Sequence, residues 1–342
     1  MQRRQVLGVI GGAAAFWSRP RALAQQPGRM PRVGVLSSQI QGDSETNDRI
    51  AALLNGLGKL GWSDGRNVII DVRYAGGSPE ALLASSRELI DLKPDVLFAS
   101  ATSALVALQK MTGTIPVVFA QVTDPVGAGF VKSLARPGGN ITGFTQHDFS
   151  IGVKWLELLR ELAPRVRRVG IVFDPNNPAT AGYLTKIRDS APSFDASVVE
   201  LPVPVSGAHE LAAAALDTAV ERFSHGSDGG LIILPGPGPS IIVRRNQIVR
   251  LAERYRLPAV YPFRYWVSAG GLAFYGIDNI ELHRNAAAYI DRILKGEKPG
   301  ELPIQNAIKF ELVINLKAAR ALGIEPSVTL LARADQVIES TD

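Results

Sequence analysis

The chain has 342 residues, 46% of them hydrophobic, and a formal net charge of +5 at pH 7. Four of its 37 basic residues and none of its 32 acidic residues lie in residues 1–24, so the rest of the chain is nearly neutral, which argues against nucleic acid or a membrane surface as a partner. The absence of cysteine excludes disulfides, thiolate nucleophiles and Cys-ligated metals.

Residues 1–24 predict an export signal. Arg3 and Arg4 precede a weakly apolar stretch over 6–17, and Ala22-Leu23-Ala24 has the A-x-A form of a cleavage site. The adjacent arginines favour the twin-arginine route, with the ordinary secretory route as the alternative. The stretch is too short and too rich in Gly and Ala to span a membrane. We therefore expect a periplasmic protein whose signal is cleaved after about Ala24.

Short β-branched apolar runs alternate with helical patterns through the rest of the chain, which is typical of parallel α/β units. Strands are expected at 32–36, 68–74, 96–99, 116–120 and 141–144, and a second set at 168–173, 198–201, 231–234, 259–261 and 272–274. Helices are expected between them, among others at 48–60, 79–92, 153–162, 209–223 and 244–255. Ser78 should cap the helix that begins at Pro79.

The second set of strands repeats the first. Residues 32–36 (RVGVL) recur as 168–172 (RVGIV), and 115–119 (IPVVF) recur as 257–261 (LPAVY). A chance match between apolar strands is the alternative, but the matches follow the same order along the chain. The repeat predicts two α/β domains of one topology, which suits a chain of this length.

Small and polar residues follow the expected strands at the place where parallel sheets bind ligands, beyond their carboxyl ends. These segments are Ser37–Gln39, Ser100–Ser103, Gln121–Asp124, Asp174–Asn177 and Pro235-Gly236. Two facing sheets would direct both sets into one cleft. The helix that opens at Thr102-Ser103 would offer free backbone N–H groups to a carboxylate, and Asp174 and Asp278 could meet an ammonium group. Helix caps and turns are the alternative interpretation of each residue.

Several stretches carry a resemblance to a known family. Among them are the signal RRQVLGVIGGAAAF, IPVVFAQVTDPVGAGFVKSLARPGGNITGFT at 115–145, and KPGELPIQNAIKFELVINLKAARALG at 298–323. With them the chain resembles the ABC-transporter substrate-binding proteins of the tryptophan/tyrosine-binding type. The resemblance implies a type I periplasmic binding protein, in which two Rossmann-like lobes with parallel sheets close on a small polar or amino-acid-like ligand and deliver it to an inner-membrane ABC permease. We expect a monomer without catalysis, cofactor or metal.

Carried over by position, the family pattern places ligand loops in both lobes, which are expected at 32–143 with 276–302 and at 144–275 with 303–336. The expected ligand-binding residues are Ser38, Gln39, Ser100, Ala101, Thr102, Thr123 and Asp124 in the first lobe, Asp174, Asn177, Pro235 and Gly236 in the second, and Tyr275 and Asp278 at the hinge. Helix 281–294 should return to the first lobe and segment 308–322 to the second.

The chain departs from the family at 235–240, where Pro-Gly-Pro-Gly-Pro-Ser stands in place of a Thr-Asp-Asn element. Because proline has no N–H group, we expect this loop to supply shape more than hydrogen bonds. The departure argues against an aromatic amino acid as the cargo.

An enzyme is the competing interpretation, in the form of a secreted, hydrolase-like α/β protein acting on a small molecule. The sequence has no G-x-S-x-G motif, and its four histidines, His147, His209, His225 and His283, stand in no recognisable motif. His209 and His283 lie in helical patterns, where we expect exposed or satisfied surface side chains. An NAD-type oxidoreductase would need a Gly-rich turn, and the candidate Gly236-x-Gly238 is interrupted by prolines. A transcription regulator with such lobes would carry a helix-turn-helix instead of the export signal.

Six aromatic residues cluster near the expected crossover between the lobes: Tyr261, Phe263, Tyr265, Trp266, Phe274 and Tyr275. We expect most of them to pack in the core or between the lobes. Those nearest the strand ends could stack on a planar ligand.

Overall fold

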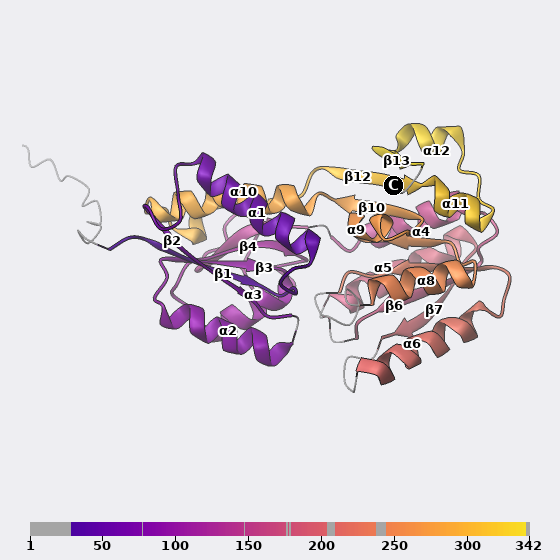
Figure 1. Cartoon of the computed structure of the whole chain (residues 1–342), viewed down its shortest axis with the longest axis horizontal. Coiled ribbons are helices and arrows are strands. Elements are labelled where there is room, and N and C mark those ends of the chain that lie inside the picture. The colour runs from indigo at the N-terminus through magenta and orange to yellow at the C-terminus, as the bar shows by residue number, and fades with distance from the viewer. Residues whose placement is uncertain are drawn as a thin grey trace, which may run out of the picture.

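The computed structural model describes residues 29–76, 78–146, 148–175, 177, 179–203, 209–236 and 244–339. The expected export signal, residues 237–240 of the proline-rich loop and His147 lie outside these ranges. The described part forms two α/β lobes side by side, each with its own sheet (Figure 1). The predicted fold class, two α/β lobes with largely parallel sheets, is confirmed. None of the helices in the described ranges is long and apolar enough to cross a membrane.

The first lobe contains a six-stranded parallel sheet in the order β11-β5-β4-β3-β1-β2. Its strands are β1 (Arg32–Ser37), β2 (Ile69–Tyr74), β3 (Val96–Ser100), β4 (Val117–Val122), β5 (Ile141–Thr145) and β11 (Gln305–Asn306). Its helices are α1 (Ser44–Lys59), α2 (Pro79–Asp91), α3 (Thr102–Met111), α10 (Asn279–Leu294) and the short η2 (Pro299–Glu301). Apolar residues of α1 and α10 pack on one face of the sheet, and those of α2 and α3 on the other.

The second lobe contains a seven-stranded sheet in the order β13-β12-β10-β9-β8-β6-β7. Its strands are β6 (Arg168–Phe173), β7 (Ser197–Pro202), β8 (Gly229–Ile233), β9 (Ala259–Tyr261), β10 (Ala273–Ile277), β12 (Phe310–Asn315) and β13 (Gln336–Ile338). Its helices are α4 (Ile151–Leu162), α5 (Thr180–Ser190), η1 (Ala191–Phe194), α6 (His209–Ser224), α8 (Arg245–Arg254), α9 (Arg264–Ser268), α11 (Leu316–Leu322) and α12 (Val328–Arg333). This sheet is not wholly parallel, because β12 runs antiparallel to β10. The sequence had not predicted β11, β12 or β13.

The chain passes from one lobe to the other between β5 and α4, between β10 and α10, and between β11 and β12. After the second crossing α10 packs beside α1 (Figure 1). A Cβ atom at Gly56 would lie 2.8 Å from the Cβ of Ala287, so this close approach of the two helices requires glycine.

Capping residues fix where two of the helices begin. Ser78 caps α2 as predicted and accepts a hydrogen bond from the N–H of Ala81 at 3.3 Å. Asp43 caps α1 by accepting from the N–H of Thr46 at 3.0 Å, so α1 starts at Ser44 and not at residue 48 as the sequence predicted. An N-cap carboxylate satisfies an N–H group that has no partner within the helix.

Candidate functional site

A pocket lies between the lobes where the loops that follow their strands meet. It is lined by Gln39, Ala101, Thr102, Gln121, Thr123 and Gln146 from the first lobe and by Asn177, Ala179, Pro235, Gly236 and Phe263 from the second. We call it the interlobe pocket. Its cavity volume is about 20 Å³, which is room for about one water molecule. A larger solute can therefore enter only if the lobes separate or the side chains move.

The backbone of the first lobe is strained around this pocket. Ala101 has φ 83° and ψ 161°, a conformation that is nearly exclusive to glycine, and Gln121 and Asp124 also have positive φ, at 63° and 44°. The pairing of β4 with β5 shifts register between Ala120 and Val122, which accommodates Gln121. Such strain costs energy and persists only where the surrounding fold imposes it. Its position at two neighbouring strand ends indicates a preorganised site.

Helix α3 points its first turn at the pocket. The helix has ten residues, and among the described residues no side chain caps it. Thr102 and the unpaired backbone N–H groups of this first turn carry the partial positive charge of a helix N-terminus. The geometry suits an anionic or strongly accepting group of a ligand.

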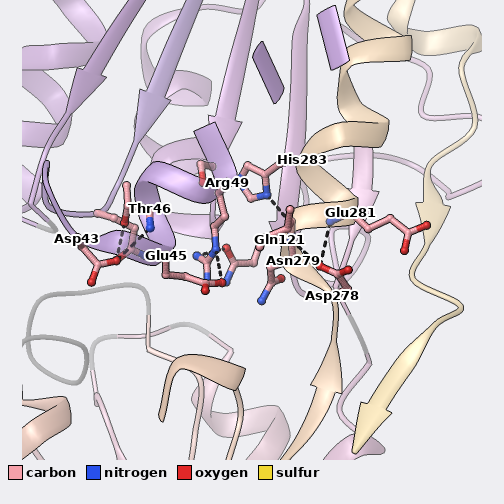
Figure 2. Close-up of polar contacts among 12 residues, drawn as sticks. Asp43, Glu45, Thr46, Arg49, Gln121, Asp278, Asn279, Glu281 and His283 are labelled. Atoms are coloured by element: carbon pink, nitrogen blue, oxygen red, sulfur yellow. Dashed lines mark hydrogen bonds and ion pairs between the residues drawn. The ribbon is translucent and has the colours of Figure 1, made fainter. Parts of the chain in front are cut away.

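A buried hydrogen-bonded chain supports this loop from behind. His283 of α10 is fully buried, and its Nδ1 lies 2.7 Å from the carbonyl oxygen of Asn279, which fixes the proton on Nδ1. Its Nε2, 2.8 Å from Oγ of Ser100, therefore accepts from that hydroxyl. Burial, reinforced by the positive charge of Arg49, lowers the pKa of His283 from 6.5 to about 3. Figure 2 shows His283 above Asn279 on this helix.

The Ser100–His283 pair does not form a nucleophile and base. Ser100 is buried and is absent from the described lining of the pocket, and the partner of Nδ1 is a carbonyl group where a catalytic triad has a carboxylate. A histidine with a pKa of about 3 is also a weak general base near neutral pH. The sequence had predicted a surface side chain at position 283, and that was wrong. The error arose because helical periodicity alone cannot show that α10 packs on the sheet on one side and on α1 on another.

Arg49 of α1 is a buried cation next to the pocket. Its Nε and Nη2 donate to Oε1 of Glu45 at 3.1 and 3.0 Å, and its Nη1 donates to Oε1 of Gln121 at 2.9 Å (Figure 2). The guanidinium carbon lies 5.7 Å from the ring centroid of Phe263 in the second lobe. Because the oxygen of Gln121 is occupied, its NH2 group is the polar end that remains for the pocket.

Gln146 and Thr123 connect the lobes at the other side of the pocket. Nε2 of Gln146 donates to Oγ1 of Thr123 at 2.5 Å, and Oγ1 lies 3.2 Å from the hydroxyl of Tyr183 in the second lobe. Complete burial raises the pKa of Tyr183, so it stays a neutral hydroxyl. Oε1 of Gln146 is buried and has no partner among the described residues.

Asn177 organises the loops of the second lobe. Its Nδ2 donates to the carbonyl oxygen of Pro235 at 2.6 Å, and its Oδ1 accepts from the N–H of Ala179 at 3.0 Å. Both ends of the amide are thus used within the lobe. We infer that Asn177 shapes the pocket more than it offers free hydrogen-bonding groups to a ligand.

The structure brings seven of the thirteen expected residues into the lining of the interlobe pocket: Gln39, Ala101, Thr102, Thr123, Asn177, Pro235 and Gly236. Ser38 lies behind Gln39, whose Nε2 approaches its Oγ at 3.4 Å, and Ser100 lies behind Ala101. Four residues of the described lining were not among the ligand-binding residues expected from the sequence: Gln121, Gln146, Ala179 and Phe263. Gln146 directly follows β5, so the position after a strand end could have indicated it, whereas Gln121 is the last residue but one of β4 and stood in the expected polar segment Gln121–Asp124.

Besides Ser38 and Ser100, four more expected residues lie outside the described lining of this pocket. Asp124 accepts from the N–H of Gly127 at 2.8 Å, and Asp278 caps α10 by accepting from the N–H groups of Ile280 and Glu281 at 2.9 and 3.1 Å (Figure 2). Asp174 is buried and has a partner. Tyr275 stacks on Phe310 with ring centroids 5.7 Å apart and, with Asp124, lines a neighbouring hollow that shares Gln146 with the interlobe pocket. The expected meeting of Asp174 and Asp278 around one ammonium group therefore has no counterpart in the described lining.

Comparisons with known proteins agree with this architecture. The family model described as ABC transporter substrate binding protein matches residues 32–338. The chain is 28% identical over 273 residues to the tyrosine-binding protein of Clostridioides difficile (strain R20291), a match that covers 80% of this chain and 75% of that protein.

Solved structures of similar proteins also match this chain over most of its length. A conserved domain protein from Vibrio cholerae is 30% identical, with a TM-score of 0.80 and coverage of 90% of this chain and 100% of that one. The ABC domain of a protein from Streptococcus pneumonia in complex with L-Trp is 25% identical, with a TM-score of 0.81 and coverage of 91% and 100%.

Proposed function

The chain belongs to the ABC transporter substrate-binding protein family and has the type I periplasmic binding fold, and from this premise we propose that it is the periplasmic solute-binding component of an ABC importer. It binds a small polar or amino-acid-like ligand between its lobes, as a monomer, and presents it to an inner-membrane permease. It does not transform the ligand. The expected signal, removed after about Ala24, would direct the chain to the periplasm.

One observation supports this function above the others: the interlobe pocket is built by loops of both lobes. A ligand there touches both lobes only when they are closed, so its binding free energy favours the closed form. Because the cavity of about 20 Å³ holds about one water molecule, the lobes must open to admit cargo and must close around it less tightly than in this structure. Direct contacts between the lobes, such as Arg245 Nη1 to Asp43 Oδ1 at 3.5 Å, break when they separate.

The first experiment is mass spectrometry of small molecules that purify with the protein from the periplasm, followed by a thermal-shift screen of solutes. A true ligand should raise the melting temperature by mass action, since it binds the native state, and should reduce the radius of gyration in solution scattering. Scattering curves that do not change when a confirmed ligand binds would argue against lobe closure.

The same samples test the enzyme alternative. A binding protein should return its ligand stoichiometrically and chemically unaltered. Product formation that depends on the protein concentration would favour a hydrolase-like enzyme instead. The mass of the periplasmic form should correspond to cleavage after about Ala24.

A further inference from the structure

We infer that the ligand of the interlobe pocket is a small carboxylate that carries a hydroxyl or amide group where an amino acid carries its ammonium group. A 2-hydroxy acid is the simplest member of this class. The inference rests on the proposed solute-binding function and narrows amino-acid-like cargo to acids without a positive charge. Three features of the pocket lead to it.

The first feature is the lack of a carboxylate for an ammonium group to pair with. Among the described residues that line the interlobe pocket, none is charged. Residues 237–243, outside the described ranges, follow Gly236 in the sequence and include no acidic residue. Three acids lie within three residues of a lining residue along the chain, Asp124, Asp148 and Asp174, and each already has a partner. An ammonium group would therefore lose its hydration without gaining an anion, which is unfavourable.

The second feature is the positive potential on the first-lobe side. The uncapped first turn of α3 and the hydroxyl of Thr102 face the pocket, and the amide NH2 of Gln121 remains available because Arg49 occupies its oxygen. Glu45 balances much of the charge of Arg49, so the helix end and these donors are the main attraction for an anion. The same groups repel a cation. A ligand carboxylate fits this side of the pocket.

The third feature is a buried acceptor in the described lining that has no partner there. Gln146 is 5% exposed, its Nε2 is bound to Thr123, and its Oε1 has no partner among the described residues. A buried acceptor without a partner is unfavourable, so a ligand that donates a hydrogen bond there gains affinity. A neutral amide oxygen is a sufficient hydrogen-bond acceptor for a hydroxyl or an amide N–H of the ligand. It is a poor substitute for the carboxylate that a desolvated ammonium group requires.

The test uses pairs of probes that differ only at the second carbon: phenyllactate with phenylalanine, indole-3-lactate with tryptophan, and 2-hydroxyisocaproate with leucine. Affinities are measured by calorimetry on the full protein purified from the periplasm. We expect the hydroxy acid of at least one pair to bind tenfold or more tightly than its amino acid. In Gln146→Glu, a carboxylate replaces the open oxygen, and the preference should move toward the amino acid. Gln109→Glu, which adds the same charge at an exposed site on α3, should leave the preference unchanged.

Each result has a defined meaning. Tighter binding of the amino acid in every pair that binds would overturn the inference, and so would equal affinities. Binding of uncharged solutes with no response to any carboxylate would also overturn it while leaving the importer proposal in place. If no small molecule of any class binds, both the inference and the proposed function fail. A Gln146→Glu protein that does not fold leaves the wild-type comparison to decide.

Discussion

Lowering the pH should destabilise the protein through His283. This side chain is fully buried, and its pKa is lowered from 6.5 to about 3, mainly by burial. Because the folded-state pKa lies below the unfolded one, the stability contributed by the neutral imidazole is complete above about pH 6.5 and is lost progressively as the pH falls toward 3. Between pH 7 and pH 5, the unfolded chain binds a proton here that the folded chain does not. At about 1.36 kcal/mol per pKa unit, this lowers the free energy of unfolding by about 2 kcal/mol.

The assay is urea unfolding at pH 7 and pH 5 of the wild type and of His283→Gln. Glutamine can keep one hydrogen bond to Ser100 but does not titrate, so the variant should be less stable at pH 7 because its packing is poorer. Its further decline between pH 7 and pH 5 should be smaller than that of the wild type by about 2 kcal/mol. All other groups titrate in both proteins and cancel. Equal declines would refute a neutral, buried His283.

Three further predictions concern the pocket and the fold. Thr102→Ala should weaken ligand binding in calorimetry by about 1 kcal/mol, and Thr102→Asp by much more, because a like charge would face the ligand carboxylate. Unchanged affinity in Thr102→Asp would remove this residue from the site. Gly143→Ala should lower the free energy of unfolding by about 2 kcal/mol or more in urea titrations, because its Cβ would lie 2.2 Å from a carbonyl oxygen of β4. Gly139→Ala, with open space around it, is the control, and equal effects would contradict this packing. Tyr183→Phe removes the 3.2 Å contact with Thr123 between the lobes, so scattering should give a larger radius of gyration without ligand; an unchanged radius would show that this contact does not hold the lobes together.

Local sequence patterns were sufficient for the first ten strands of the two lobes, but not for β11, β12 and β13. The apolar run Val96–Ala99 predicts a strand that the structure places at β3, and Ser78 caps α2 because capping depends only on neighbouring residues. The position of ligand loops after parallel strands follows from the alternation of strands and helices. By that rule the sequence predicted Thr102, Thr123 and Asn177 as ligand-binding residues. All three line the interlobe pocket. Their contact with a ligand stays a prediction.

Which of the candidate side chains face the pocket was decided by the tertiary structure. Asp278 was an equally good candidate in the sequence, but its carboxylate caps α10, and no local pattern distinguishes a cap from a ligand group. His283 looked like a surface residue because its burial depends on β3, which lies some 183 residues away in the chain at Ser100. The antiparallel β12 likewise follows from a third crossing between the lobes. Hydrophobic periodicity specifies whether a segment forms a helix or a strand. The direction of a polar side chain depends on contacts between segments that are distant in sequence.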